Sequence, residues 1–205
     1  MSGIPLGHRR HWIFDMDGTL TVAMHDFDAI RADLGLPAGL PILESLQALP
    51  PEVERAKRAQ LDRLEEDLAH TAKVAPGAHD CLATLQRHGS RLGILTRNSQ
   101  RNVEVTLEAC GLAAFFAEAD RVTRDDGPPK PDPGGIEWLL ERWGATPSEA
   151  VMVGDYEFDL LSGRAAGCAT VHVDPSGAFP WPELSDREVR SLAELVPELS
   201  RQVDS

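Results

Sequence analysis

Several features are scarce in this 205-residue sequence, and each scarcity excludes a class of protein. Its three cysteines lie far apart without a Cys-x-x-Cys pair, which is not the pattern of a structural zinc site or a disulfide framework. No run reaches the roughly 18 apolar residues that a membrane-spanning helix needs. Lys and Arg number 20 against 33 for Asp and Glu, and the resulting formal charge of −13 disfavours binding to nucleic acid or to an anionic membrane.

The scarce cysteines and the N-terminal residues also bear on location. We expect Cys81, Cys110 and Cys168 to be buried free thiols, as in a reducing compartment. The first fifteen residues hold no apolar run of the length found in a signal peptide, so we expect a cytoplasmic protein. A composition of 42% hydrophobic and 26% charged residues is typical of a folded chain, and the length fits one domain with a modest insertion.

Four short apolar runs predict buried strands, because strands of a parallel sheet covered on both faces are almost continuously apolar. Helical patterns over residues 77–88, 99–110 and 136–143 separate them. Strands that alternate with helices indicate an α/β fold with a parallel sheet, in which ligands bind beyond the carboxyl ends of the strands. The four runs are HWIF before Asp15, RLGIL before Thr96, VMVG before Asp155 and ATVHV before Asp174.

Two capping boxes predict further helix starts. Thr146 and Glu149 have the right spacing, with Pro147 at the first helical position. Ser185 and Glu188 have the same spacing, and we expect a terminal amphipathic helix after them that packs on the core.

One interval is too long for a simple crossover. About 75 residues separate Asp15 from the strand that begins at Arg91, whereas a crossover needs roughly a dozen or more. We therefore predict an inserted piece over residues 21–75, placed between core segments 1–20 and 76–205. Since it follows the end of a strand, we expect it to form a lid over the ligand rather than a helical hairpin on the domain's edge. Its charged helix, from about residue 52 to 73, is expected to bury Val53, Ala56, Leu61, Leu64 and Leu68.

The segment FDMDGTL places two carboxylates at the end of the first strand. Asp15 and Asp17 project to the same side because side chains alternate along a strand. Gly18 lets the backbone come close to a ligand. Adjacent carboxylates repel each other unless a cation intervenes, so the pair indicates a metal site; a helix N-cap or a surface turn is the alternative reading.

Three further stretches are predicted to meet these carboxylates at the same edge of the sheet: Thr96, Lys130 in PPKPDP, and GDYEFD with Asp155 and Asp159. Clustered carboxylates suit Mg²⁺, which keeps waters and phosphate oxygens among its ligands. A carboxylate can attack phosphorus and form an aspartyl-phosphate, and a neighbouring carboxyl can protonate the leaving group. A lysine and a hydroxyl can hold the phosphoryl oxygens.

These motifs, in this order, resemble those of the haloacid dehalogenase-like hydrolase superfamily, in its phosphatase-like branch. The resemblance implies a Rossmann-like parallel sheet flanked by helices, with a small helical cap inserted after the first strand. It implies Mg²⁺ as cofactor, Asp15 as nucleophile and metal ligand, and Asp17 as general acid/base with its backbone carbonyl on the metal. Asp155 would be a further metal ligand, supported by Asp159. Thr96 and Lys130 would bind the phosphoryl group, beside the backbone at Gly18. Arg97 and Asn98, which follow Thr96, are candidate phosphate or substrate contacts, with a plain loop or helix N-terminal role as the alternative.

An acid at Asp17 points to phosphate esters within that superfamily, because haloacid dehalogenases need no proton donor. The expected substrate is a small phosphorylated metabolite, and the expected state is a monomer or a homodimer. In the cap, His25, Arg31 and Lys57 are candidate substrate contacts or plain surface residues. The alternatives are a phosphonatase with Lys57 as Schiff-base nucleophile, a sugar-phosphate mutase, and a non-catalytic phospho-acceptor or regulatory domain.

Overall fold

The computed structural model describes residues 5–23 and 27–200 and contains one six-stranded parallel sheet of order β3-β2-β1-β4-β5-β6. The predicted α/β fold class is therefore confirmed. Each of the four predicted strands is present. The strands are β1 (His11–Phe14), β2 (Arg91–Leu95), β3 (Arg121–Val122), β4 (Ala150–Gly154), β5 (Ala169–Val173) and β6 (Arg187–Val189).

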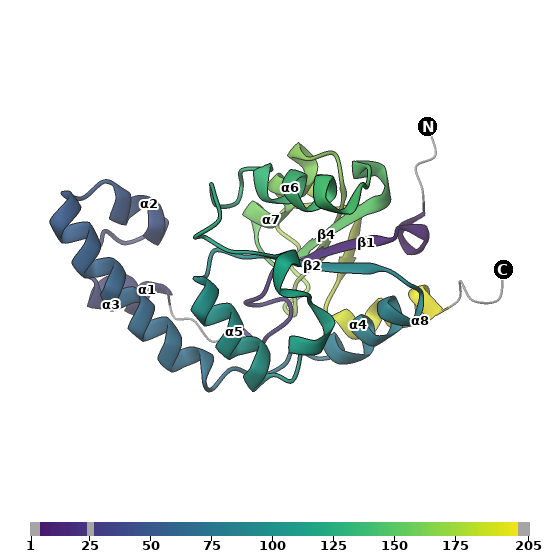
Figure 1. The fold of residues 1–205 in the computed structure, drawn as a ribbon, viewed down its shortest axis with the longest axis horizontal. Coiled ribbons are helices and arrows are strands. Elements are labelled where there is room, and N and C mark those ends of the chain that lie inside the picture. Colours follow the sequence, from purple (N-terminus) through teal and green to yellow (C-terminus); the bar gives the residue numbers. More distant parts are fainter. Residues whose placement is uncertain (1–4, 24–26, 201–205) are drawn as a thin grey trace.

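Helices cover both faces of the sheet (Figure 1). The core consists of one apolar cluster on each face of the sheet. Because side chains alternate along β1, Trp12 and Phe14 belong to one cluster and Ile13 to the other. The first cluster includes α4 (Ala78–Arg87), α5 (Gln100–Ala109) and α8 (Val196–Ser200); the second includes α6 (Gly134–Trp143), and α7 (Glu157–Ala165) lies on that side too. Short 3₁₀ turns are η1 (Leu6–His8), η2 (Ala113–Phe115), η3 (Glu118–Asp120), η4 (Pro147–Glu149), η5 (Pro182–Leu184) and η6 (Leu192–Glu194).

Local signals set the limits of two helices beside the sheet. The Ser99 hydroxyl accepts a hydrogen bond from the Asn102 backbone N–H at 3.3 Å and so caps the start of α5. Gly144 ends α6 with a left-handed φ of 62°, a conformation that suits glycine. These boundaries agree with the helices predicted from the sequence.

The inserted residues form α1 (Phe27–Asp33), α2 (Ile42–Gln47) and α3 (Pro51–Ala69), which stand together beside α5 (Figure 1). They have an apolar cluster of their own, to which Leu34, Leu46 and Leu61 belong. The chain leaves and returns at neighbouring points, because Thr21 and Val74 form an antiparallel bridge. The division into a core and a cap at residues 21 and 75 stays a prediction.

The expected apolar face of the long inserted helix is wrong in its first half. Val53 is 40% exposed and Ala56 is also exposed, whereas Leu61 is buried. The apolar cluster of α1 and α2 takes in Leu61 and Leu68 but neither of the first two residues, so the first half of α3 contributes little to it. Glu65 is buried on the same helix, which the sequence did not predict.

The expected helix start at Ser185–Glu188 is also wrong, since Arg187–Val189 form the edge strand β6. The terminal helix begins later, at Val196, and packs on the core through Leu199. At Thr146 the capping box is present, yet it encloses only the three-residue turn η4 because β4 begins at Ala150.

The three cysteines are free thiols, as expected; Cys81 and Cys168 are buried and Cys110 is half-buried. Within the described residues, no helix combines the length and the apolar character that crossing a membrane requires.

Candidate functional site

Three carboxylates meet at the carboxyl end of the sheet, beyond its two central strands β1 and β4. Asp15 follows β1, Asp155 follows β4, and Asp159 lies in the first turn of α7. Each offers one oxygen within 4.8 Å of the others, and this is the one such acidic, histidine or cysteine group found among the described residues. The parallel register of β1 with β4 brings the two strand ends side by side.

Lys130 joins this cluster from the proline-rich segment before α6. The lysine is 3% exposed, and its Nζ donates to Asp15 Oδ1 and, at 2.5 Å, to Asp159 Oδ1. Burial alone would lower the pKa of Lys130, but attraction to the two carboxylates outweighs it and raises the pKa above its usual value. The ammonium group therefore stays charged between two acids that come from different elements.

One lysine does not balance the negative charge. Burial and repulsion from neighbouring carboxylates raise the pKa of Asp15 to about 7, against the attraction of Lys130. The same causes raise the pKa of Asp155 to about 9. A crowded, buried, oxygen-only donor set that resists ionisation fits a hard divalent cation such as Mg²⁺, whose charge would favour the ionised carboxylates.

Gly18 keeps the loop after β1 close to Asp155. Its φ is +83°, and a Cβ at this position would lie 2.1 Å from Asp155 Oδ2. Any larger residue would push the Asp155 carboxylate away or displace the loop, so the close approach requires glycine.

Asp159 has both carboxylate oxygens engaged by the protein. Oδ1 accepts from Lys130, and Oδ2 accepts from the Tyr156 backbone N–H at 3.0 Å. This residue is therefore placed to orient Lys130, whereas the support of Asp155 predicted for it stays a prediction.

Asp17 lies on the loop after β1, and its side chain is held by residues that follow β2. The Asn98 side-chain amide donates to Asp17 Oδ2, and the Thr96 hydroxyl accepts from the Asn98 backbone N–H at 3.2 Å. Thr96 and Asn98 are both buried, at 3% and 6% exposure. The structure thus brings Asp17, Thr96 and Asn98 to one place beside the cluster.

Arg97 lines the site but is engaged by the insertion. Its Nη2 donates to both oxygens of Glu44 on α2, at 2.8 and 2.6 Å, and its Nη1 donates to the Lys130 backbone carbonyl at 2.5 Å. The guanidinium also lies over the Phe158 ring, 5.2 Å from its centroid. Arg97 therefore connects the inserted helices with the segment that carries Lys130.

A cavity of about 400 Å³ lies over the carboxylates, between the sheet edge and the inserted helices. Asp15, Asp17 and Lys130 are among its lining residues. Apolar and aromatic side chains also line it from both sides: Leu40, Ile42, Leu43 and Leu61 of the insertion, and Tyr156 and Phe158 of the core.

Glu65 and Arg124 also line the cavity, and neither was predicted as a site residue. Arg124 has a side chain that is 3% exposed and pairs with Asp62 and Glu65 of α3. Burial raises the pKa of Glu65 to about 7, although Arg124 pulls it down. One sequence signal was available, because Glu65 lies four residues from both Leu61 and Ala69, on the buried face of the helix.

The candidate contacts of the insertion differ in position. Arg31 lines the cavity, whereas Lys57 donates to the Leu34 backbone carbonyl and is not among the lining residues. His25 lies outside the described residues.

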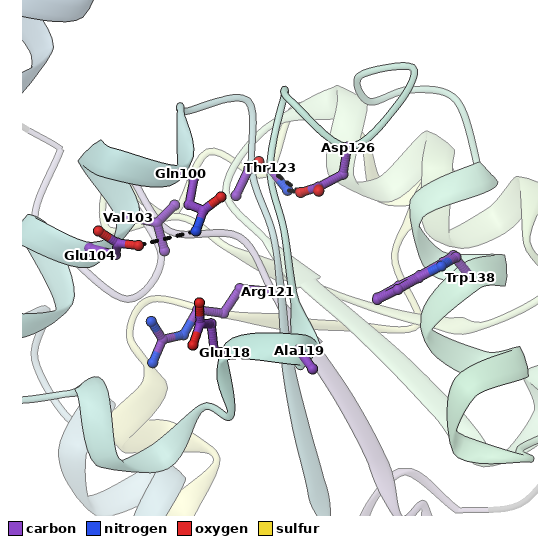
Figure 2. A pocket seen from close by; sticks show the side chains of 9 residues that line it. All are labelled: Gln100, Val103, Glu104, Glu118, Ala119, Arg121, Thr123, Asp126 and Trp138. Atoms are coloured by element: carbon purple, nitrogen blue, oxygen red, sulfur yellow. Dashed lines mark hydrogen bonds between the residues drawn. The ribbon is translucent and has the colours of Figure 1, made fainter.

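A second hollow lies beside α5 and α6, away from the carboxylates (Figure 2). Its polar side chains bond to each other: Gln100 donates to Glu104 at 3.2 Å, and the Thr123 hydroxyl donates to Asp126 at 2.7 Å. None of the clustered carboxylates Asp15, Asp155 and Asp159 lines it.

The chain is similar to known proteins over most of its length. A family model described as haloacid dehalogenase-like hydrolase matches residues 31–173. A Saccharomyces cerevisiae protein described as an uncharacterized hydrolase is 34% identical over 200 residues, 93% of this chain and 91% of that protein. A phosphoglycolate phosphatase of Chromobacterium violaceum is 31% identical over 216 residues, 93% of this chain and 96% of that protein.

A solved structure has the same fold at low identity. A predicted phosphoglycolate phosphatase from Haemophilus somnus superposes with a TM-score of 0.77 at 20% identity, covering 95% of this chain and 99% of that one.

Proposed function

The chain belongs to the haloacid dehalogenase-like hydrolase family, and from this premise we propose that it is a Mg²⁺-dependent phosphatase that hydrolyses a small phosphate monoester through an aspartyl-phosphate. The observation that carries the proposal is the buried Lys130 ammonium, held between Asp15 and Asp159 at the floor of the cavity. A positive charge fixed beside a nucleophilic carboxylate suits the transfer of an anionic group.

In the first step an Asp15 oxygen attacks phosphorus, forming the aspartyl-phosphate as the bond from phosphorus to the leaving oxygen breaks. Lys130 favours the ionised form of Asp15 and binds the phosphoryl oxygens. The buried Thr96 hydroxyl is placed beside Asp17 and Asn98 to donate to the same group.

Asp17 gives its proton to the leaving oxygen and later takes one from the water that attacks the aspartyl-phosphate. The Asn98 amide donates to one Asp17 oxygen, so the carboxyl is oriented before substrate binds. The second step releases phosphate and restores the ionised Asp15.

Asp15, Asp155 and the Asp17 backbone carbonyl would hold the metal, with Asp159 orienting Lys130. When bound, Mg²⁺ would offset the charge of these carboxylates and of the phosphoryl oxygens, which the single lysine does not balance.

Two alternatives have less support. A phosphonatase would need a cap lysine facing the substrate, but Lys57 donates to the Leu34 carbonyl and does not line the cavity. A phospho-acceptor domain of the receiver type places its acidic pair and acceptor before the Thr and Lys, whereas here Asp15 comes first and a helical insertion follows it.

The test is hydrolysis of p-nitrophenyl phosphate, followed by a panel of phosphate esters, with purified protein and Mg²⁺. We expect release of phosphate that stops with EDTA and returns when Mg²⁺ is added in excess. Failure to turn over any ester in the panel, with Mg²⁺ present and the protein folded, would contradict the proposal.

A further inference from the structure

Glu65 is a buried carboxylate that the insertion places over the cavity. It lies on α3, is 8% exposed, and lines the same cavity as Asp15, Asp17 and Lys130. Its negative charge is near enough to Asp17 for the two to repel each other. The proposed mechanism uses Asp17 at the leaving oxygen, and Glu65 lines the same cavity close to Asp17.

The two oxygens of Glu65 are not equally engaged. Oε1 accepts a hydrogen bond from Arg124 Nη1 at 3.1 Å. Oε2 lies 2.9 Å from the same nitrogen, an ion-pair contact, yet it is buried and accepts no hydrogen bond from any described residue. A buried carboxylate oxygen is costly to leave without a donor, so this position favours a ligand that brings one.

The arginines that line the cavity are already paired with carboxylates. Arg97 binds Glu44, and Arg124 binds Asp62 and Glu65. Arg31 binds Asp28, although its Nε is buried without a hydrogen-bond partner among the described residues. An additional carboxylate on the substrate would therefore compete with an existing ion pair and meet the charges of Glu65 and Asp17.

The cavity thus favours a ligand group that can donate a hydrogen bond to Glu65 and that carries no negative charge, and a hydroxyl group has both properties. It donates to an acceptor such as Glu65 Oε2, it accepts from a donor such as Arg31 Nε, and it carries no charge. We infer that Glu65 is a specificity-determining residue that accepts a hydrogen bond from a hydroxyl of the leaving group, so that the substrate is a phosphate monoester of a polyhydroxy compound rather than of a hydroxy acid. This inference rests on the proposed phosphatase function.

The experiment compares polyol monophosphates of two to six carbons with the alkyl phosphates of the same lengths and with phosphoglycolate. At about pH 8, above the Glu65 pKa of about 7, wild-type kcat/KM should favour the polyol ester of at least one length by roughly 10- to 100-fold, the effect of one hydrogen bond to a charged acceptor. Glu65→Ala should bring that ratio close to one, because kcat/KM should fall further for the polyol esters than for the alkyl esters. Glu65→Gln, a neutral acceptor of similar volume, should give an intermediate ratio.

Asp62→Asn is the matched control, because it removes the other α3 partner of Arg124 and leaves Glu65 in place. It should keep the wild-type ratio. A role of Glu65 in folding alone would lower kcat/KM for polyol and alkyl esters equally, and that result would overturn the inference. Should Glu65→Ala fail to fold, an unchanged ratio in Glu65→Gln would overturn it as well.

The outcomes separate this inference from the proposed function. Hydrolysis of p-nitrophenyl phosphate and of alkyl phosphates without preference for any polyol, or a preference for phosphoglycolate over every polyol ester, would leave the phosphatase in place and remove the role of Glu65. Absence of all turnover would remove the phosphatase itself.

Discussion

Lys130 shows how an individual residue depends on its surroundings in this fold. A lysine that is 3% exposed would be expensive by itself, yet here two carboxylates accept its hydrogen bonds. Removing either partner would leave a buried charge with half of its compensation. The three groups therefore function as a unit, and single substitutions within it should have effects that do not add.

Asp15→Asn should abolish turnover, because an amide is a poor nucleophile. We expect a loss of roughly 1,000-fold or more in kcat with p-nitrophenyl phosphate, the scale on which removal of a nucleophile acts. A rate like that of the wild-type protein would contradict the covalent route.

Gly18→Ala should disable the metal site. The new Cβ would lie 2.1 Å from Asp155 Oδ2, and the residue would have to keep a φ of +83°. We expect a large drop in Mg²⁺ affinity, measured as the Mg²⁺ concentration for half-maximal activity. Gly111→Ala is the control: its φ is +67° and its Cβ would meet nothing within 4 Å, so it carries only the backbone cost of about 1–2 kcal/mol. Equal Mg²⁺ requirements in the two variants would argue against a steric effect on Asp155.

The residues of the carboxylate cluster were predictable, whereas Glu65 and Arg124 of the cavity wall were not. Asp15, Asp155 and Lys130 follow strands or stand in motifs whose place at the sheet edge is set by local pattern and by the parallel topology. Glu65 and Arg124 become important only because a helix from the insertion lies against the core. Such a contact depends on how two distant segments meet, and no local pattern specifies it.

At the scale of elements, length decides what the sequence reveals. Strands β1, β2, β4 and β5 have four or five residues each and are largely buried, so their apolar runs stand out. Strands β3 and β6 have two and three residues at the sheet edges. Edge strands carry polar residues, and Ser185 with Glu188, at the start of β6, therefore had the pattern of a helix start instead.

The contact between α2 and the core should affect substrate binding. Glu44→Gln removes the partner of Arg97, which is only partly exposed and also bonds to the Lys130 carbonyl. We expect KM to rise by about two- to fivefold with little change in kcat, in line with an ion pair of about 0.5–1 kcal/mol.

A double-mutant cycle with Arg97→Gln tests whether this effect comes from the pair. The two substitutions together should cost less than the sum of the two alone. Strict additivity would mean that Glu44 acts through another contact.

At the scale of the whole molecule, the carboxylate cluster makes stability depend on pH when metal is absent. Asp15 and Asp155 have pKa values of about 7 and 9, raised from 3.8 by burial and mutual repulsion. From the unfolded-state pKa of 3.8 up to these raised values, the folded chain holds more protons than the unfolded chain, so the free energy of unfolding falls as pH rises. With EDTA, the unfolding temperature should drop by roughly 5 °C or more from pH 5 to pH 8, and Mg²⁺ should reduce the drop.

Asp155→Asn separates this effect from the titration of other groups. It removes the carboxylate with the higher pKa, and the variant should show a flatter decline in EDTA than the wild-type protein. An unfolding temperature in EDTA that stays constant or rises over the same pH range would contradict the crowding of charge at this site.

The distribution of charge matters more than its sum. Some of the 33 acids belong to the insertion and pair with arginines of the core, so these pairs add nothing to the net charge of −13: Glu44 with Arg97, Glu66 with Arg101, and Asp62 with Arg124. The net charge disfavours polyanions, but these pairs hold the inserted helices over the cavity and leave Lys130 at its floor. We therefore expect higher salt concentrations to weaken this contact.

The bridge between Thr21 and Val74 brings together the two ends of the inserted segment. The Val22 N–H donates to the Lys73 carbonyl at 2.8 Å, so the polypeptide departs from the sheet edge and rejoins it at adjacent positions. A segment joined in this way can be exchanged for another of different length without shifting the register of any strand. Transplanting the helices of a relative between these two residues should give a folded hybrid with an unaltered carboxylate cluster and Lys130. Its preference among phosphate esters should be that of the relative that supplied the helices.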